Sequence, residues 1–162
     1  MFEEIQKRIE TLVIEISDLS PGDRSKIRTA DARVSRGIPI QSNALDLIED
    51  LDLKGSPTWL LLAACFAYRS EFHDPDVSLG KATNNLERSR NPSKDSRLLL
   101  DLLSTVGKPL ESKIRRLFYR LVRDYQTFNY CHLAYLLVHQ RGRVADSIRL
   151  RIAQDHVRNQ SY

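Results

Sequence analysis

Cysteine is scarce in this chain of 162 residues, which contains only Cys65 and Cys131. The two cysteines lie far apart, each within a strongly apolar segment, so we expect neither a disulfide framework nor a metal site built on paired cysteines. Two buried thiols suit a reducing compartment, and we therefore expect a cytoplasmic protein.

Long hydrophobic runs are also missing. The longest one, WLLLAACFAY at 59–68, has about half the length that a membrane-spanning helix needs. The opening segment MFEEIQKRIE is acidic and amphipathic, which differs from the basic and apolar pattern of a signal peptide. We expect no association with a membrane.

Strand signals are almost absent, because apolar residues recur at helical spacing through most of the chain. Ser-Pro pairs at 20–21 and 56–57 are typical of helix starts, and Gly37 followed by Pro39 is typical of a helix end. The fold class predicted is all-α, a compact bundle of eight or nine helices. We expect one domain over 1–162, with any subdivision near 90–95 and helices over about 2–17, 21–36, 42–52, 57–70, 78–89, 96–104, 109–124, 130–139 and 143–157.

Positive charge is gathered in blocks, although the excess of 25 Lys and Arg over 21 Asp and Glu is small. Residues 20–36 carry five cations and two acids, as do residues 81–97, and residues 108–123 carry six cations and one acid. Such blocks are the pattern of a surface that faces a polyanion.

The predicted helix at 109–124 separates its residues into two faces. Its apolar residues recur every three or four positions and predict a buried stripe, made of Leu110, Ile114, Leu117, Phe118, Leu121 and Tyr125. Lys113, Arg116, Arg120 and Arg123 recur at the same intervals on the opposite face, with no acid among them. Like charges at this spacing repel each other. A phosphate-binding face and an ordinary solvated face both remain open for this helix, and Tyr119 beside it is either a base-stacking ring or an aromatic at the edge of the core.

The segment LSPGDRSKIRTADARVSRG at 19–37 places cations at a helix start, where the peptide dipoles already leave partial positive charge. Arg24 and Arg28 flank one side of its apolar stripe, and Lys26 and Arg33 flank the other. The amides of the helix start together with two arginines would cradle an anion. An ion pair between Arg28 and Asp31 is the alternative for Arg28.

No catalytic motif is visible, and we predict that the chain is not an enzyme and needs no cofactor or metal. A metal-dependent hydrolase is the alternative, centred on His73 and Asp74 or on His132 and His139. The first pair lies in HDPD, a turn-forming cluster, and the second pair lies on an apolar helix that favours satisfied core histidines.

Four segments in order resemble the small subunit of the type I-E CRISPR surveillance complex Cascade, the CasB family. They are LSPGDRSKIRTAD (19–31), WLLLAACFAYRSEFHDPDVSLGKATNNL (59–86), SKDSRLLLDLLST (93–105) and LESKIRRLFYRLV (110–122). The chain departs from that family at VHQRGR (138–143), where a tryptophan is common, and at Thr29, where a second arginine is frequent.

The resemblance implies a helical, non-catalytic protein that is present in two copies among the other subunits of the complex. Such a protein helps to hold the guide RNA–target DNA hybrid and the displaced DNA strand, the R-loop. The matched positions imply that nucleic acid contacts Arg24, Arg28, Lys81, Arg97, Arg115 and Arg116. The helical faces add Lys26, Lys113, Arg120 and Arg123. The isolated subunit is expected to bind nucleic acid weakly at physiological salt. The alternative function is a helical adaptor or scaffold that binds an acidic protein partner.

Overall fold

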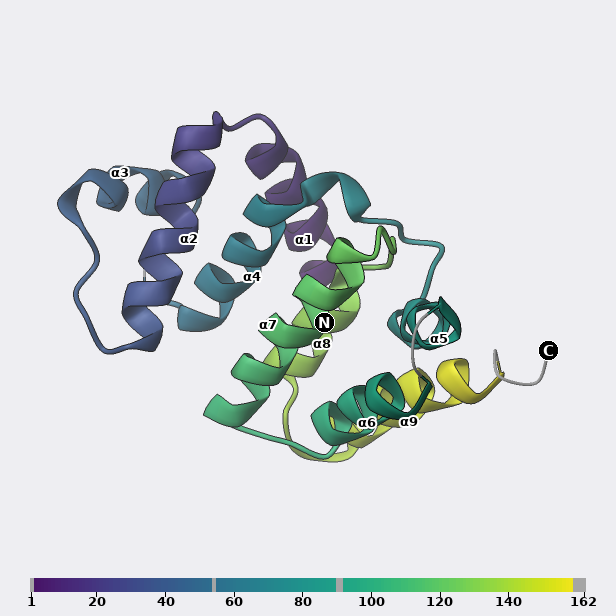
Figure 1. The fold of residues 1–162 in the computed structure, drawn as a ribbon. Helices are drawn as coiled ribbons and strands as arrows, with labels where there is room; N and C mark the ends of the chain where they lie inside the picture. The colour runs from purple at the N-terminus through teal and green to yellow at the C-terminus, as the bar shows by residue number, and fades with distance from the viewer. Residues whose placement is uncertain (1, 54, 90–91, 159–162) are drawn as a thin grey trace. The chain divides into compact units, whose positions relative to one another are not determined.

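The structure is a computed structural model that describes the backbone of residues 2–53, 55–89 and 92–158. It also describes the side chains of these residues, except those of residues 87–97. In these ranges the chain forms nine α-helices and one 3-10 turn, with no β-strand (Figure 1). The predicted all-α class is therefore confirmed. The helices are α1 (Phe2–Ser17), α2 (Pro21–Ser35), α3 (Ser42–Asp50), α4 (Pro57–Tyr68), α5 (Leu79–Ser89), α6 (Pro92–Leu103), α7 (Lys108–Arg123), α8 (Cys131–Val138) and α9 (Arg143–Arg158), with the 3-10 turn η1 (Ser70–Phe72) between α4 and α5.

The chain divides near Glu71 into two compact units. Unit 1 comprises residues 3–71. Unit 2 comprises the described residues from Phe72 onwards, together with Phe2. The division lies well before the segment 90–95, where the sequence favoured any subdivision. Residues 92–95 lie in the first turn of α6, and α5 and α6 pack against each other within unit 2.

Unit 1 is organised around α4, which packs on α2 (Figure 1). The hydroxyl of Ser20 accepts a hydrogen bond from the amide of Asp23 at 3.1 Å and caps the start of α2. Gly37 adopts a positive φ of 71° just after this helix, a backbone conformation that glycine reaches without a steric penalty. Both ends of α2 thus follow the signals in the sequence. All residues of α4 from Leu60 to Ala67 are buried, as its apolar composition predicts.

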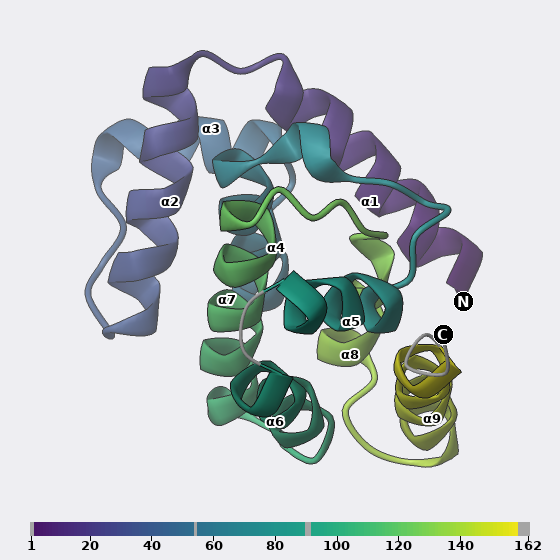
Figure 2. The same cartoon turned by 45° about the vertical axis from the view of Figure 1, so that its right-hand side comes forward.

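Unit 2 is organised around α5, which packs on α6, α7 and α9 (Figure 2). Gly80 lies against the backbone of α9, since a Cβ at this position would lie 2.4 Å from the carbonyl oxygen of Ile152 and 2.7 Å from the amide of His156. No side chain fits there without a shift of backbone. The start of α5 is capped twice. The hydroxyl of Ser78 accepts from the amide of Lys81 at 3.1 Å, and Nδ1 of His132 accepts from the amide of Leu79 at 3.1 Å.

One residue of the expected core stripe lies outside the core. Leu110, Ile114, Leu117, Phe118 and Leu121 are fully buried, but Tyr125 is 78% exposed. The prediction for Tyr125 is wrong because α7 ends at Arg123 and the backbone of Tyr125 then turns to a φ of 58°. Beyond a helix end, helical spacing no longer determines which way a side chain points.

Within the described ranges, no helix combines the length and the apolar character needed to cross a lipid bilayer.

Candidate nucleic-acid interface

The exposed face of α7 is built from arginines and one tyrosine. Arg116, Arg120 and Arg123 are exposed at intervals of four and three residues, and Tyr119 is 37% exposed between them. Residues at this spacing are neighbours on one side of a helix. The only acid in α7 is Glu111, in its first turn. The face therefore gathers three arginines, of which Arg120 has an interaction within the chain, and Asp124 caps the end of the helix.

The side chains of two arginines of this face have no polar partner among the described residues. Arg116 and Arg123 form no hydrogen bond or ion pair with any described residue, and they lie two turns apart along α7. Arg123 stands in the last turn, where the helix dipole favours a cation. Arg116 stands in the middle of the helix, where the dipole gives no such benefit. An anion from outside the chain would be the natural counter-charge for both.

Lys113 belongs to a different environment from the arginines with which the sequence groups it. Its Nζ lies 2.9 Å from a carboxylate oxygen of Asp101 and donates to the hydroxyl of Thr105 at 2.7 Å. Both partners come from the end of α6 and the turn that follows it. Lys113 thus ties α7 to α6, and its charge is neutralised within unit 2. Arg115 is half-buried at the edge of the core stripe.

Two other sites were expected in unit 2, Lys81 and Arg97. Lys81 is exposed in the first turn of α5, next to the point where Gly80 contacts α9. The side chain of Arg97 lies outside the described residues. The structure therefore places Arg116, Arg120 and Arg123 on one face of α7, and it places Lys81 on a different helix, α5.

The cations of α2 are mostly engaged within unit 1. Arg24 donates from Nε to the carbonyl oxygen of Ile16 at 3.1 Å and from Nη2 to that of Ser17 at 2.8 Å. These carbonyls form the negative end of α1, so the guanidinium caps that helix. Lys26 forms an ion pair of 3.3 Å with Asp23. The crowding of cations at the start of α2 is thus compensated by groups of the same unit.

Two further cations of α2 differ in their surroundings. Arg33 donates to the carbonyl oxygen of Pro39 at 2.7 Å and closes the turn after the helix. Arg28 is exposed and forms no polar contact with the described residues, while Asp31 is buried. Arg28 is therefore the residue of this segment whose charge is available to a ligand.

Three of the four side chains named for the enzyme alternative accept hydrogen bonds from backbone amides, and the fourth, His139, has a buried Nε2 with no hydrogen-bond partner among the described residues. Nδ1 of His73 accepts from the amide of Tyr130 at 3.1 Å, and a carboxylate oxygen of Asp74 accepts from the amide of Asp76 at 2.9 Å. Burial lowers the pKa of His132 to about 4, an effect that Asp155 opposes and Arg151 reinforces. His132 is therefore neutral at pH 7 and free to accept the hydrogen bond from α5. The described residues contain no cluster of three or more metal-ligating side chains.

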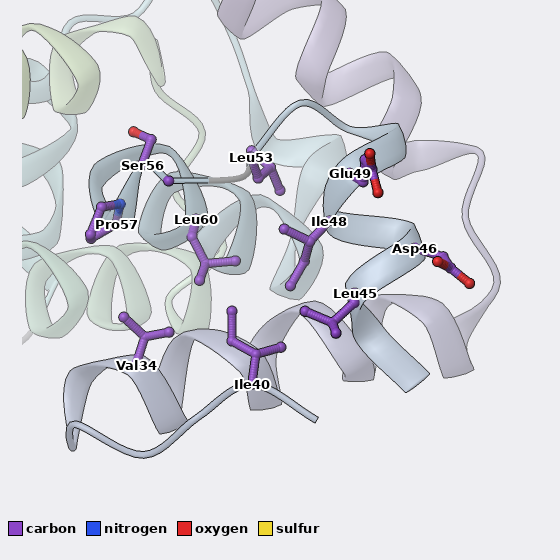
Figure 3. A pocket seen from close by; sticks show the side chains of 11 residues that line it. Val34, Ile40, Leu45, Asp46, Ile48, Glu49, Leu53, Ser56, Pro57 and Leu60 are labelled. Atoms are coloured by element: carbon purple, nitrogen blue, oxygen red, sulfur yellow. The ribbon is translucent and has the colours of Figure 1, made fainter. Parts of the chain in front are cut away.

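Unit 1 contains an apolar hollow with a volume of about 550 Å³, which the sequence did not lead us to expect. Figure 3 shows Val34, Ile40, Leu45, Ile48 and Leu60 pointing into it from α2, the following loop, α3 and α4. Two of the described residues that line the hollow are charged, and both are acids, Asp46 and Glu49. A hollow assembled from four chain segments has no local sequence signal.

The chain was compared with protein-family models, with curated proteins and with solved structures, and none of them matches.

Proposed function

We propose that this protein is a non-catalytic subunit that binds the backbone of nucleic acid, and more specifically the small subunit of a type I-E CRISPR surveillance complex in the cytoplasm. The observation that supports binding is the exposed arginine face of α7, in which Arg116 and Arg123 have no counter-charge among the described residues. The resemblance of four ordered segments to the CasB family supports the specific assignment. Its partners would be the other subunits of the complex, a second copy of this chain, the guide RNA and the target DNA.

Contacts of this kind recognise charge and carry no sequence information. Arginines on a helix face bind phosphate oxygens of any sequence, and their contribution falls as the salt concentration rises. Opening a DNA duplex against a guide RNA is nearly balanced in free energy, so a few backbone contacts can tip the equilibrium. The assembly would hold the α7 face next to the strand at high effective concentration, so that weak intrinsic affinity is sufficient.

The test is capture of target DNA by the reconstituted assembly, with the wild-type chain, without the chain, and with the double variant Arg116→Glu/Arg123→Glu. We expect the double variant to be incorporated normally and to weaken capture and strand opening about tenfold or more, because each reversal replaces an attraction to phosphate by a repulsion. The matched control is Lys7→Glu/Arg36→Glu, which reverses the charge of two exposed residues of unit 1 and should leave capture unchanged.

Two results would overturn the proposal. If the chain does not enter the assembly, the assignment to the surveillance complex fails. If capture is the same with and without the chain, or falls equally with the control, then the α7 face does not bind the nucleic acid.

Docking of another protein is a second function, favoured by the apolar hollow of unit 1. Leu45 is 49% exposed at this hollow, and Asp46 and Glu49 line it. An apolar segment flanked by Lys or Arg would fit this chemistry, whereas an acidic partner would have to use the arginine faces instead. If the α7 face binds a partner protein rather than nucleic acid, and if this binding persists at high salt, the chain is a helical adaptor and not a nucleic-acid-binding subunit.

A further inference from the structure

The end of α7 carries a tyrosine where a glycine is usual. The amide of Gln126 donates to the carbonyl oxygen of Leu121 at 2.9 Å, and that of Tyr125 donates to Val122 at 3.1 Å. This is the Schellman pattern of helix termination, in which the residue after the cap takes a positive φ. Among the described residues other than glycine, only Asp52 and Tyr125 have a positive φ. Such a backbone costs a bulky residue about 1 kcal/mol or more.

The ring of Tyr125 gains little burial that would offset this cost. The residue is 78% exposed, and its ring meets that of Phe72 only at a centroid distance of 6.2 Å. An aromatic ring of this size normally stabilises a protein by leaving water. The position therefore places an aromatic ring in solvent directly after the end of α7, at the expense of stability. A ring so exposed is available to a ligand that has an aromatic face of its own.

Tyr119 offers a second ring on the same helix. It is 37% exposed, it lies three residues after Arg116 and four before Arg123, and its ring meets Phe118 edge-on at 6.0 Å. Packing against Phe118 fixes one edge of the ring, while part of the ring remains open to solvent. The second half of α7 and the turn after it thus carry two partly exposed tyrosines and two exposed arginines.

We infer that the second half of α7 and Tyr125 form a platform for unpaired nucleotides, on which Tyr119 and Tyr125 stack against bases while Arg116 and Arg123 bind the phosphates between them. This inference rests on the proposed function, because it assumes that the face binds nucleic acid. Bases of a duplex are stacked on each other and cannot reach the rings, so the platform selects single strands. It tolerates any sequence, because every base has a face on which tyrosine can stack.

The test measures fluorescence anisotropy of the full-length protein at low salt with three labelled ligands of about twenty nucleotides. These are a thymidine strand, a strand of the same backbone without bases, and a duplex. We expect the thymidine strand to bind about tenfold or more tightly than the abasic strand. Tyr119→Ala and Tyr125→Ala should each lower affinity for the thymidine strand about fivefold, which corresponds to the lower end of the range measured for base–aromatic stacking. Neither variant should change affinity for the abasic strand.

Two variants of Tyr125 separate binding from folding. Tyr125→Phe retains the ring and should retain affinity for the thymidine strand. Tyr125→Gly removes the ring and suits the positive φ, so it should leave thermal stability unchanged or raised while affinity falls. A loss of affinity that follows a loss of stability across these variants would overturn the role in stacking.

The outcomes distinguish this inference from the proposed function. Equal affinity of the wild type for the thymidine and abasic strands overturns stacking, and binding to phosphates then stands if Arg116→Ala/Arg123→Ala abolishes it. Equal or tighter binding of the duplex overturns the selection of single strands. If the wild type binds none of the three ligands even at low salt, both the platform and binding by the α7 face are wrong.

Discussion

In α2, the guanidinium of Arg24 donates two hydrogen bonds to the last carbonyls of α1, and Lys26 pairs with Asp23. In α7, Arg116 and Arg123 extend from the helix without a partner among the described residues. Both helices carry more cations than acids in the sequence, four against two in α2 and six against one in α7. The difference is whether a helix end or a carboxylate lies within reach. A run of basic residues therefore indicates an anionic ligand only if the carboxylates and helix ends of the protein itself do not already neutralise those residues.

The comparison extends to the way in which helices begin. In unit 1 the starts of α2 and α4 are capped by the hydroxyls of Ser20 and Ser56, which do not titrate near neutral pH. In unit 2 the start of α5 also depends on the imidazole of His132, which must be neutral to accept its hydrogen bond. Acid should therefore destabilise unit 2 by protonating His132, whereas the serine caps of α2 and α4 in unit 1 contain no group that is protonated in this range.

The largest effect that we predict comes from this histidine. The pKa of His132 is lowered to about 4 in the folded chain, against about 6.5 in an unfolded one. The unfolded state binds the proton first, so the stability that depends on neutral His132 is complete above about pH 6.5 and is lost as the pH falls to about 4. The loss should reach about 3 kcal/mol. Urea unfolding followed by circular dichroism at several pH values measures it.

The control for this prediction is His132→Asn, in which the amide oxygen can accept the hydrogen bond and cannot be protonated in this range. The variant should lose most of the acid dependence between pH 6.5 and 4. An identical pH profile for wild type and variant would show that other groups determine the acid sensitivity.

An effect of intermediate size is predicted for Arg24→Ala. The variant removes both guanidinium hydrogen bonds to the end of α1, although the carbonyl of Ile16 keeps its bond from the amide of Leu19, and it should lower the free energy of unfolding by about 2 kcal/mol. Fluorescence of Trp59, the only tryptophan of the chain, follows the unfolding of unit 1. Arg28→Ala removes an exposed arginine of the same helix and should change stability by less than about 0.5 kcal/mol. Equal effects of the two variants would remove the distinction between engaged and exposed cations in α2.

The smallest predicted effect is that of Lys113→Ala. It breaks the pair with Asp101 and the hydrogen bond to Thr105, and because the pair is partly exposed the cost should be about 1 kcal/mol in urea unfolding. Capture of target DNA should stay within twofold of the wild type, since this charge is already neutralised. Lys108→Ala, on the same helix, is the control for stability and should have almost no effect. A loss of capture like that of the double variant at Arg116 and Arg123 would place Lys113 on the binding face after all.

The fold was predictable where its signals are local. Ser20 with Pro21 and Gly37 mark the two ends of α2, and the apolar spacing of α7 identifies its buried stripe up to Leu121. The extension of that stripe to Tyr125 failed because the helix stops first. Its end is set by a Schellman turn with tyrosine in the place of glycine, which no local rule anticipates.

The candidate site was predictable only in part, since charge spacing finds a face and does not find its counter-charges. Arg116, Arg120 and Arg123 lie on one exposed face as the spacing predicts. Asp101 comes from another helix to neutralise Lys113, and the end of α1 comes to Arg24. The acceptor for the start of α5 is His132, 53 residues further along the chain. Such partners are chosen by tertiary packing, so they become visible only in the structure.

The contact of Gly80 with Ile152 and His156 also sets an order in which the chain can mature during synthesis. The helices of unit 1 are all synthesised before unit 2 begins at Phe72, so this unit can complete its core first. Helix α5 must wait for α9, which is translated last among the described helices, and until then the backbone groove at Gly80 is open. In this interval the nascent chain presents a half-built unit to chaperones and to neighbouring chains. The close contact of α5 with α9 can therefore form only after α9 has been synthesised.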